Sequence, residues 1–393
     1  MTEQATVAIV RATEYETATI EAAVAKSLKI IGGIDDLVRP GRKILLKINH
    51  LPPASAPEKG IITHPVFTEA VIRHLQGMGA EITVGDDIES ARGFAISGYD
   101  EMCRRNGVQL INFREQGFTE TPGDGRILKS IHLANFIREV DSIINLPKLK
   151  THSLAVLTGG IKNNYGFIPS GRRVRWHGEY ARPNDFNGVL VDIFAAVKPQ
   201  LTIMDGIVAM EGEGPALGSL RQLGVILASR DTVALDTVAA AVIGLDPGTV
   251  GAIRQAAARG LGSGDLARIK TVGEKRAAVR CPDFKLPLNA TSRLTGQAPR
   301  HLIRHLMGQY TIQPYLIIEN CVHCGECQNI CPAGAIHETD GRFEIDYRKC
   351  IRCLCCGEVC RYDAIVPRRP LGGRIMNAFY KAGQRLIRSR STD

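Results

Sequence analysis

The chain has 393 residues, of which 44% are hydrophobic and 23% charged, so it has the composition of a soluble globular protein with room for two or three domains. A mean hydropathy of −0.03, with no apolar run near the ~20 residues of a membrane span, excludes the disordered and transmembrane classes. The formal net charge of +9 lies mainly in residues 148–182 and 368–393, each with seven basic residues against one acidic residue, and no aromatic residues interleave with them as a stacking platform would, so we do not expect nucleic-acid binding.

Residues 1–275 are predicted to form an α/β domain. The start of the chain has neither the basic segment nor the apolar core of an export signal, so we expect a cytoplasmic protein. Apolar runs predict strands at 7–10, 43–47, 82–84, 108–111, 142–146, 201–204 and 223–228, and helical periodicity predicts helices at 17–31, 65–75, 187–197, 232–243 and 249–259. This alternation predicts a mostly parallel sheet with helices on both faces.

Polar segments follow four of the predicted strands. They are Asn49-His50, Gly85-Asp86-Asp87, the run 147–152 and Asp205-Gly206, which leads to residues 211–215. Because ligands of such folds bind at the carboxyl ends of the strands, we expect these segments to form the floor of a binding site.

The basic residues after the strand at 142–146 are the main candidates for chemistry. We expect Lys148, Lys150 and Lys162 to hold an anionic oxygen, with Asn163 and Asn164 as neutral hydrogen-bonding groups. His152 is the candidate proton carrier, and Lys150 is placed with it as catalytic. The alternative interpretation is a solvated basic face with one ordinary histidine.

Three acidic residues, Asp205, Glu211 and Glu213, form a second candidate group. Their oxygen atoms are suitable ligands for a divalent cation, or partners for the lysines. The neighbouring glycines are typical of turns, so solvated acids are the favoured interpretation, and whether they bind a further metal is left open. Asp86 and Asp87 have the same ambiguity.

These motifs together resemble a known family. The segments Leu146-Pro147-Lys148-Leu149-Lys150-Thr151-His152, Gly160-Ile161-Lys162-Asn163-Asn164-Tyr165-Gly166, Met204-Asp205-Gly206 and Glu211-Gly212-Glu213-Gly214-Pro215 are similar to the domain of unknown function 362. The resemblance covers roughly residues 6–250 and implies an iron–sulfur protein without naming a substrate. The glycine spacing fits neither a dinucleotide fingerprint nor a Walker loop, so flavin and nicotinamide have no positive support.

Four prolines mark residues 276–315 as a linker, with a predicted helix at 300–310, and nine of the 11 cysteines follow it. They form two runs with the spacing C-x2-C-x2-C-x3-C, which is typical of bacterial two-cluster ferredoxins, and the motif Ala335-Ile336 recurs 29 residues later. Residues 316–367 are therefore predicted to be a small α+β ferredoxin-like domain.

The spacing predicts two 4Fe-4S clusters as cofactors. In this pattern the fourth cysteine of each run ligates the other cluster. The predicted ligands are Cys321, Cys324, Cys327 and Cys360 for the first cluster, and Cys350, Cys353, Cys356 and Cys331 for the second. Zinc sites use cysteine pairs with a longer spacer, and disulfides need an oxidising compartment, so both alternatives fit less well.

The tail, residues 368–393, is predicted to be a basic amphipathic helix. Such a helix can lie on an anionic membrane, dock on an acidic partner, or pack on its own domain. For the whole chain we expect an iron–sulfur oxidoreductase that passes electrons to or from an anionic substrate in the α/β domain. The alternatives are an electron carrier or adaptor for a redox partner, and a non-redox enzyme with structural clusters.

Overall fold

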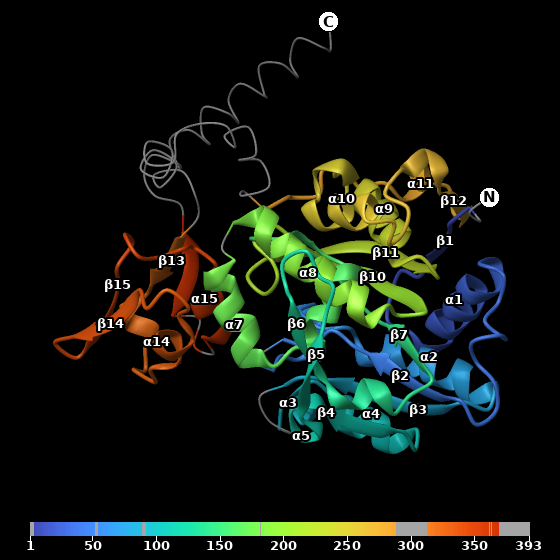
Figure 1. The fold of residues 1–393 in the computed structure, drawn as a ribbon, viewed down its shortest axis with the longest axis horizontal. Helices are drawn as coiled ribbons and strands as arrows, with labels where there is room; N and C mark the ends of the chain where they lie inside the picture. Colours follow the sequence, from blue (N-terminus) through green and yellow to red (C-terminus); the bar gives the residue numbers. More distant parts are fainter. Residues whose placement is uncertain are drawn as a thin grey trace, which may run out of the picture. The chain divides into compact units, whose positions relative to one another are not determined.

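The computed structural model describes residues 4–51, 54–88, 92–180, 182–287, 313–360, 362 and 364–368. The chain forms two compact units, Met1–Leu286 and Pro287–Asp393, which we describe separately. The predicted helix at 300–310 and the tail beyond residue 368 lie outside the described residues. Figure 1 shows the elements coloured along the sequence.

The first unit alternates strands and helices along the chain (Figure 1). Its strands are β1 (Thr6–Arg11), β2 (Lys43–Lys47), β3 (Glu81–Asp86), β4 (Gln109–Asn112), β5 (Phe118–Pro122), β6 (Ser130–Ala134), β7 (Ser142–Asn145), β8 (Lys148–His152), β9 (Val156–Thr158), β10 (Leu201–Glu211), β11 (Ser219–Ser229) and β12 (Lys270–Gly273). Its helices are α1 (Thr17–Ile30), α2 (Pro65–Gly77), α3 (Arg92–Ile96), α4 (Tyr99–Arg105), α5 (Phe113–Gln116), α6 (Gly160–Asn163), α7 (Ser170–Glu179), α8 (Pro183–Val197), α9 (Thr232–Val242), α10 (Gly251–Ala258) and α11 (Arg276–Val279). Short 3-10 helices include η1 (Pro57–Lys59) and η3 (Asn164–Phe167).

Within the described residues, the main sheet has ten strands in the order β12-β1-β11-β10-β7-β2-β3-β4, and β8 with β9 continues from β10. Strand β11 is antiparallel to β1 and β10, whereas β2, β3, β4 and β7 pair in parallel. The predicted α/β class with a mostly parallel sheet is therefore confirmed. The separate hairpin of β5 and β6 was not predicted, because its strands are only partly apolar.

Alternation along the strands builds a core on each face of the sheet. In β2, Ile44 and Leu46 pack with α1 and α2, whereas Leu45 packs into the other cluster with Phe186 and Val189 of α8. Successive side chains of a strand point to opposite faces, so a continuous apolar run indicates a strand covered on both sides.

The run 147–152 is a strand and not the predicted loop. Pro147 interrupts the chain after β7, and β8 then pairs in parallel with the long strand β10 through Asp205 and Met210. All five residues of β8 are buried. The sequence pattern hid this strand, because lysine and histidine alternate with apolar residues as they do at an exposed surface.

The second unit is built from two equivalent halves. One half contains β13 (Gln313–Leu316), α14 (Glu326–Ile330) and β14 (Ile336–Thr339); the other contains β15 (Arg342–Ile345), α15 (Cys355–Val359) and β16 (Ile365–Arg368). Each element recurs 29 residues later. Strand β13 pairs with β16, and β14 pairs with β15, so each two-stranded sheet joins the two halves.

Candidate functional site

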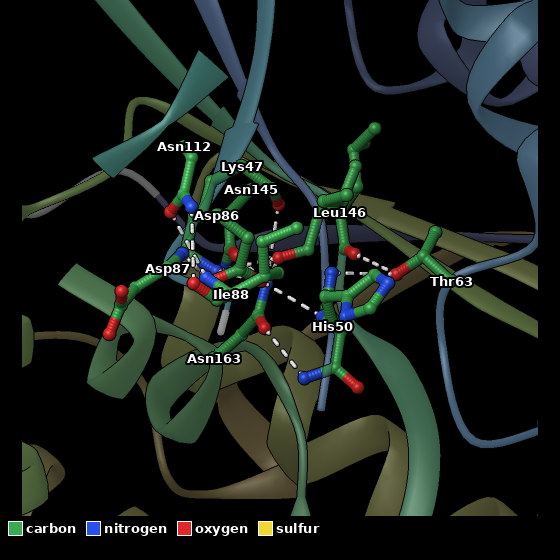
Figure 2. Close-up of polar contacts among 12 residues, drawn as sticks. Lys47, His50, Thr63, Asp86, Asp87, Ile88, Asn112, Asn145, Leu146 and Asn163 are labelled. Atoms are coloured by element: carbon green, nitrogen blue, oxygen red, sulfur yellow. Dashed lines mark hydrogen bonds and ion pairs between the residues drawn. The ribbon is translucent and has the colours of Figure 1, made fainter. Parts of the chain in front are cut away.

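Polar side chains gather where β2, β3, β4 and β7 end (Figure 2). Lys47, Asp86, Asn112 and Asn145 are the last residues of these strands, and all four are buried. Neighbouring parallel strands end at the same edge of a sheet, so the topology brings these distant residues together.

The centre of this group is a buried ion pair. The Lys47 Nζ atom lies 2.8 Å from the Asp86 carboxylate and donates to the carbonyl of Ile48. Burial lowers the pKa of Lys47, and the charge of Asp86 opposes this shift. A Cβ at Gly166 would lie 2.5 Å from Asp86, so glycine at this position lets η3 approach the pair. The pair therefore holds the strand ends and the η3 segment together.

The two predicted asparagines join this framework. Asn163 donates to the Asn145 Oδ1 atom (2.7 Å) and accepts from the Asn49 Nδ2 atom (3.0 Å). Asn164 donates to the Gly160 carbonyl (2.8 Å), while its buried Oδ1 atom has no hydrogen-bond partner among the described residues. Asn163 is thus engaged with the protein itself, and Asn164 keeps one acceptor.

Lys148 is the most tightly held of the predicted lysines. Its Nζ atom lies 2.8 Å from the Asp205 Oδ2 atom and 2.6 Å from the Tyr15 hydroxyl, which itself donates to Asp205. The Tyr15 ring stacks on His64 with centroids 3.7 Å apart. Burial raises the pKa of Tyr15, and the charge of Asp205 raises it further. The Asp205 carboxylate is therefore paired with a lysine.

Lys150 and His152 lie on the same face of β8 as Lys148, because alternate residues of a strand share a face. The Lys150 Nζ atom donates to the Ile61 carbonyl at 2.5 Å. The His152 Nδ1 atom accepts from the N–H groups of Leu154 and Ala155, so the neutral ring carries its proton on Nε2.

The environment of His152 is positive. Burial lowers its pKa well below the usual value, followed by the charges of Lys162, His177 and Lys150. His177, 6.2 Å away between ring centroids, has a pKa lowered to about 4, first by burial. Its Nδ1 atom faces the Arg173 carbonyl at 2.7 Å. At neutral pH both rings are therefore uncharged hydrogen-bonding groups, whereas the sequence suggested a proton carrier that titrates near pH 7.

His50 adds a third histidine beside Lys150. Its backbone N–H donates to the Asp86 carboxylate (2.8 Å), and its ring is only 3% exposed. Neither ring nitrogen has a hydrogen-bond partner in the part of the chain that the structure describes. Burial lowers its pKa to about 3, with further contributions from Lys47 and Lys150. Buried polar atoms normally have a partner, so this ring is a candidate ligand contact.

Sequence reasoning placed Asn49, His50, Asp86 and Asp87 at strand ends but gave them no role. It missed Tyr15, His64, Arg173 and His177. Arg173 forms a buried ion pair with Asp87 at 2.7 Å. None of these four follows an apolar strand directly, so the strand-end signal could not find them.

The acidic residues do not come together as a metal site. Glu211 lies 3.2 Å from the Lys285 Nζ atom and accepts from its backbone N–H, away from the Lys148 contact of Asp205. Among the described residues, no three His, Cys, Asp or Glu side chains are grouped as ligands of one metal ion.

The eight predicted cysteine ligands line two cavities in the second unit. One cavity is lined by Cys321, Cys324, Cys327 and Cys360, and the other by Cys331, Cys350, Cys353 and Cys356. Each thus takes three cysteines from one run and one from the other. Four thiolates around an apolar cavity are suitable ligands for a 4Fe-4S cluster. The surplus Cys355 is buried and does not line either cavity.

Comparison with known proteins supports both units. The family described as "Domain of unknown function (DUF362)" matches residues 44–241, and the family "4Fe-4S dicluster domain" matches residues 313–361. The thylakoid-associated protein sll1697 of Synechocystis is 34% identical over 248 residues, which cover 62% of this chain and 76% of that protein. The pyruvate synthase subunit PorD of Methanocaldococcus jannaschii is 41% identical over 73 residues, which cover 18% of this chain and 85% of that protein.

A solved structure was also found. The lactate racemase apoprotein from Thermoanaerobacterium thermosaccharolyticum superposes with a TM-score of 0.40 at 13% identity, covering 58% of this chain and 55% of that one. In the described residues, no helix is both long and apolar enough to cross a membrane.

Proposed function

Because the chain belongs to the DUF362 family and carries a 4Fe-4S dicluster domain, we propose that it is an oxidoreductase whose clusters exchange electrons with a small anionic substrate bound in the first unit. The coarser part of this statement does not depend on a substrate. The protein is an iron–sulfur protein with an electron-carrier role, as its dicluster domain and its similarity to PorD indicate.

The observation that carries the anionic substrate is the positive field at His152. The charges of Lys162 and Lys150 both act on this buried ring. A fixed, desolvated group of cations and N–H donors stabilises negative charge on a bound oxygen better than water does. We assign Lys150 and Lys162 to the anionic oxygens and the His152 Nε2–H group to a hydrogen bond with the reacting part of the substrate.

The other predicted residues would act through position. Lys148 is held by Asp205 and Tyr15, so it would contribute charge at the rim of the site while it fixes β8 against β10. Asn163 would hold the η3 segment in place, and the Asn164 Oδ1 atom would accept from the substrate.

For the second unit we propose two clusters, one in each cysteine-lined cavity. When bound, they supply one-electron transfer. The residues around them exclude water: Pro314, Ile336 and Leu354 line one cavity, and Leu316, Phe343 and Ile365 line the other.

The experiment is an anaerobic reoxidation assay. The full chain is reduced with dithionite, freed of excess reductant and mixed with a panel of small carboxylates. One carboxylate is expected to speed cluster reoxidation and to be consumed. Lys150→Met and His152→Gln should slow this reaction at least tenfold with unchanged iron content, whereas the exposed control Lys26→Met should not. Equal rates in all variants would contradict the proposal.

A second candidate function is supported by the relatives. PorD is by name a subunit of pyruvate synthase, and an entirely partner-directed role would make this chain an electron carrier or adaptor with a redox partner. In that case no carboxylate of the panel would be consumed, and a redox protein would reoxidise the clusters at the same rate in Lys150→Met as in the wild type.

We also propose that the chain acts in the cytoplasm with peripheral membrane contact through residues 368–393. The charge of these residues and the printed name of the thylakoid-associated relative support this contact. Co-sedimentation with vesicles of 30% phosphatidylserine is expected at low salt and should decrease about tenfold in Arg385→Gln/Arg388→Gln, since each basic residue contributes about 1 kcal/mol near an anionic surface. Retention of binding by this variant would contradict the contact.

A further inference from the structure

The two halves of the second unit allow a comparison within one domain. Residues 29 apart take the same backbone conformation: His323 and Arg352 have φ of 56° and 59°, and Gly325 and Leu354 have φ of 76° and 64°. Helix α14 starts at Glu326 and α15 starts 29 residues later. Any difference between the two cysteine cavities must therefore come from side chains.

The largest difference is in charge. Residues 317–331 contain Glu319 and Glu326 and no lysine or arginine, which gives −2. The equivalent residues 346–360 contain three basic residues, Arg348, Lys349 and Arg352, against Asp346 and Glu358, which gives +1. Glu319 is thus replaced by Arg348 in the second half, and His323 by Arg352.

Arg352 and His323 occupy the most sensitive position, between the first two cysteines of each run. Arg352 is half-buried there, and a guanidinium keeps its charge at any pH that the protein tolerates. From this asymmetry we propose that the cavity of Cys350, Cys353, Cys356 and Cys331 holds its cluster at a higher reduction potential than the cavity of Cys321, Cys324, Cys327 and Cys360. The inference rests on the proposed presence of a cluster in each cavity.

The physical reason is the charge added on reduction. A reduced cluster is more negative by one charge, so nearby positive residues stabilise it and nearby acids destabilise it. Hydrogen bonds to sulfur do not distinguish the cavities: the Ala335 N–H donates to Cys331 at 3.2 Å, and the Ala364 N–H donates to Cys360 at 3.3 Å.

Solvent exposure acts in the opposite direction but differs less. Cys324 is exposed, whereas its counterpart Cys353 is half-buried, so water would favour reduction in the first cavity at this one ligand. The charge difference between the two cysteine runs is three units and is expected to prevail. The first electron from a one-electron donor would therefore reside in the second cavity, and the next electron would enter the first. No proton transfer is needed for this internal exchange.

A redox titration of the full chain tests the proposal. Anaerobically purified protein is titrated with dithionite and mediators and followed by electron paramagnetic resonance. We expect two steps separated by more than a tenfold difference in electron affinity, which is 59 mV for one electron. Arg352→Gln should lower the higher potential alone, and His323→Arg should raise the lower potential alone. Arg342→Gln, the same charge change on β15 outside both cysteine runs, should move neither.

The outcomes separate this proposal from the function it rests on. Iron and sulfide below two four-iron clusters would overturn both. Full occupancy with two equal potentials, or a shift of the lower potential in Arg352→Gln, would overturn the asymmetry and leave the two-cluster assignment intact. A shift of equal size in Arg342→Gln would also overturn it, because the effect would not be local to the cysteine run.

Discussion

The two units of this protein solve opposite problems with charged and polar groups. In the first unit, Lys47, Asp86, Lys148 and Asp205 come from distant parts of the sequence and neutralise one another inside the protein. In the second unit, eight cysteines from one short segment line cavities and have ligand chemistry that the protein does not itself satisfy. The first arrangement stabilises a fold around a site, whereas the second depends on an added cofactor.

The largest expected effect breaks the second arrangement. Cys331→Ala removes the one ligand that each cavity of this pair takes from the other run, so we expect it to lose about half of the iron and sulfide, since a 4Fe-4S cluster is held by four thiolates. Cys355→Ala is the matched control, because Cys355 does not line either cavity, and it should retain full iron content. Equal iron loss in the two variants would show that the cavity assignment is wrong.

The next effect tests neutralisation in the first unit. Asp86→Asn leaves the buried Lys47 charge without its partner and should lower the free energy of unfolding by about 3–5 kcal/mol. Trp176 is the single tryptophan, so its fluorescence during urea unfolding reports on the first unit. The double variant Lys47→Met/Asp86→Asn should recover much of the loss. If the double variant is less stable than Asp86→Asn alone, uncompensated charge is not the cause.

A pH effect of intermediate size follows from His50. Its pKa is lowered to about 3 in the folded protein from 6.5, so the folded state resists its protonation. The resulting stability is present above pH 6.5 and is lost as pH falls from 6.5 toward 3. At pH 4 the His50→Gln variant should therefore have regained about 3 kcal/mol relative to its difference from wild type at pH 7. His132→Gln, a histidine on β6, should show no comparable gain in the same urea titrations.

The smallest effect is expected at the surface of the first unit. Asp36 and Arg230 form an ion pair whose side chains are 64% and 41% exposed. Exposed pairs contribute little, so Asp36→Asn should change the free energy of unfolding by less than about 1 kcal/mol. A loss as large as that of Asp86→Asn would remove the distinction between buried and exposed charge on which the comparison rests.

Much of the fold could be read from the chain. The strands that begin at Thr6, Lys43 and Glu81 and the helices that begin at Thr17 and Pro65 were predicted to within a few residues, because each is a long apolar or strongly periodic run. The strand β8 was not, since its alternation of lysines with apolar residues is typical of an exposed surface. Only pairing with β10 buries Lys148 and Lys150.

The candidate site shows the same division. Lys150, His152 and Lys162 were placed together by their positions after one predicted strand, and the structure puts all three charges within reach of the His152 ring. Tyr15 and His177 could not be associated with them, because one precedes β2 and the other lies on α7. Their approach depends on how helices and loops pack over the sheet.

The sequence alone determined the class of the fold, the duplication of the second unit and the eight cluster ligands, because cysteine spacing and strand periodicity are local properties of the chain. The tertiary structure decided which charges are buried, which are neutralised, and which histidines surround Lys150. These properties depend on contacts between residues far apart in sequence, such as Lys148 with Asp205 and Tyr15, and on the removal of water from them. No local pattern encodes that burial.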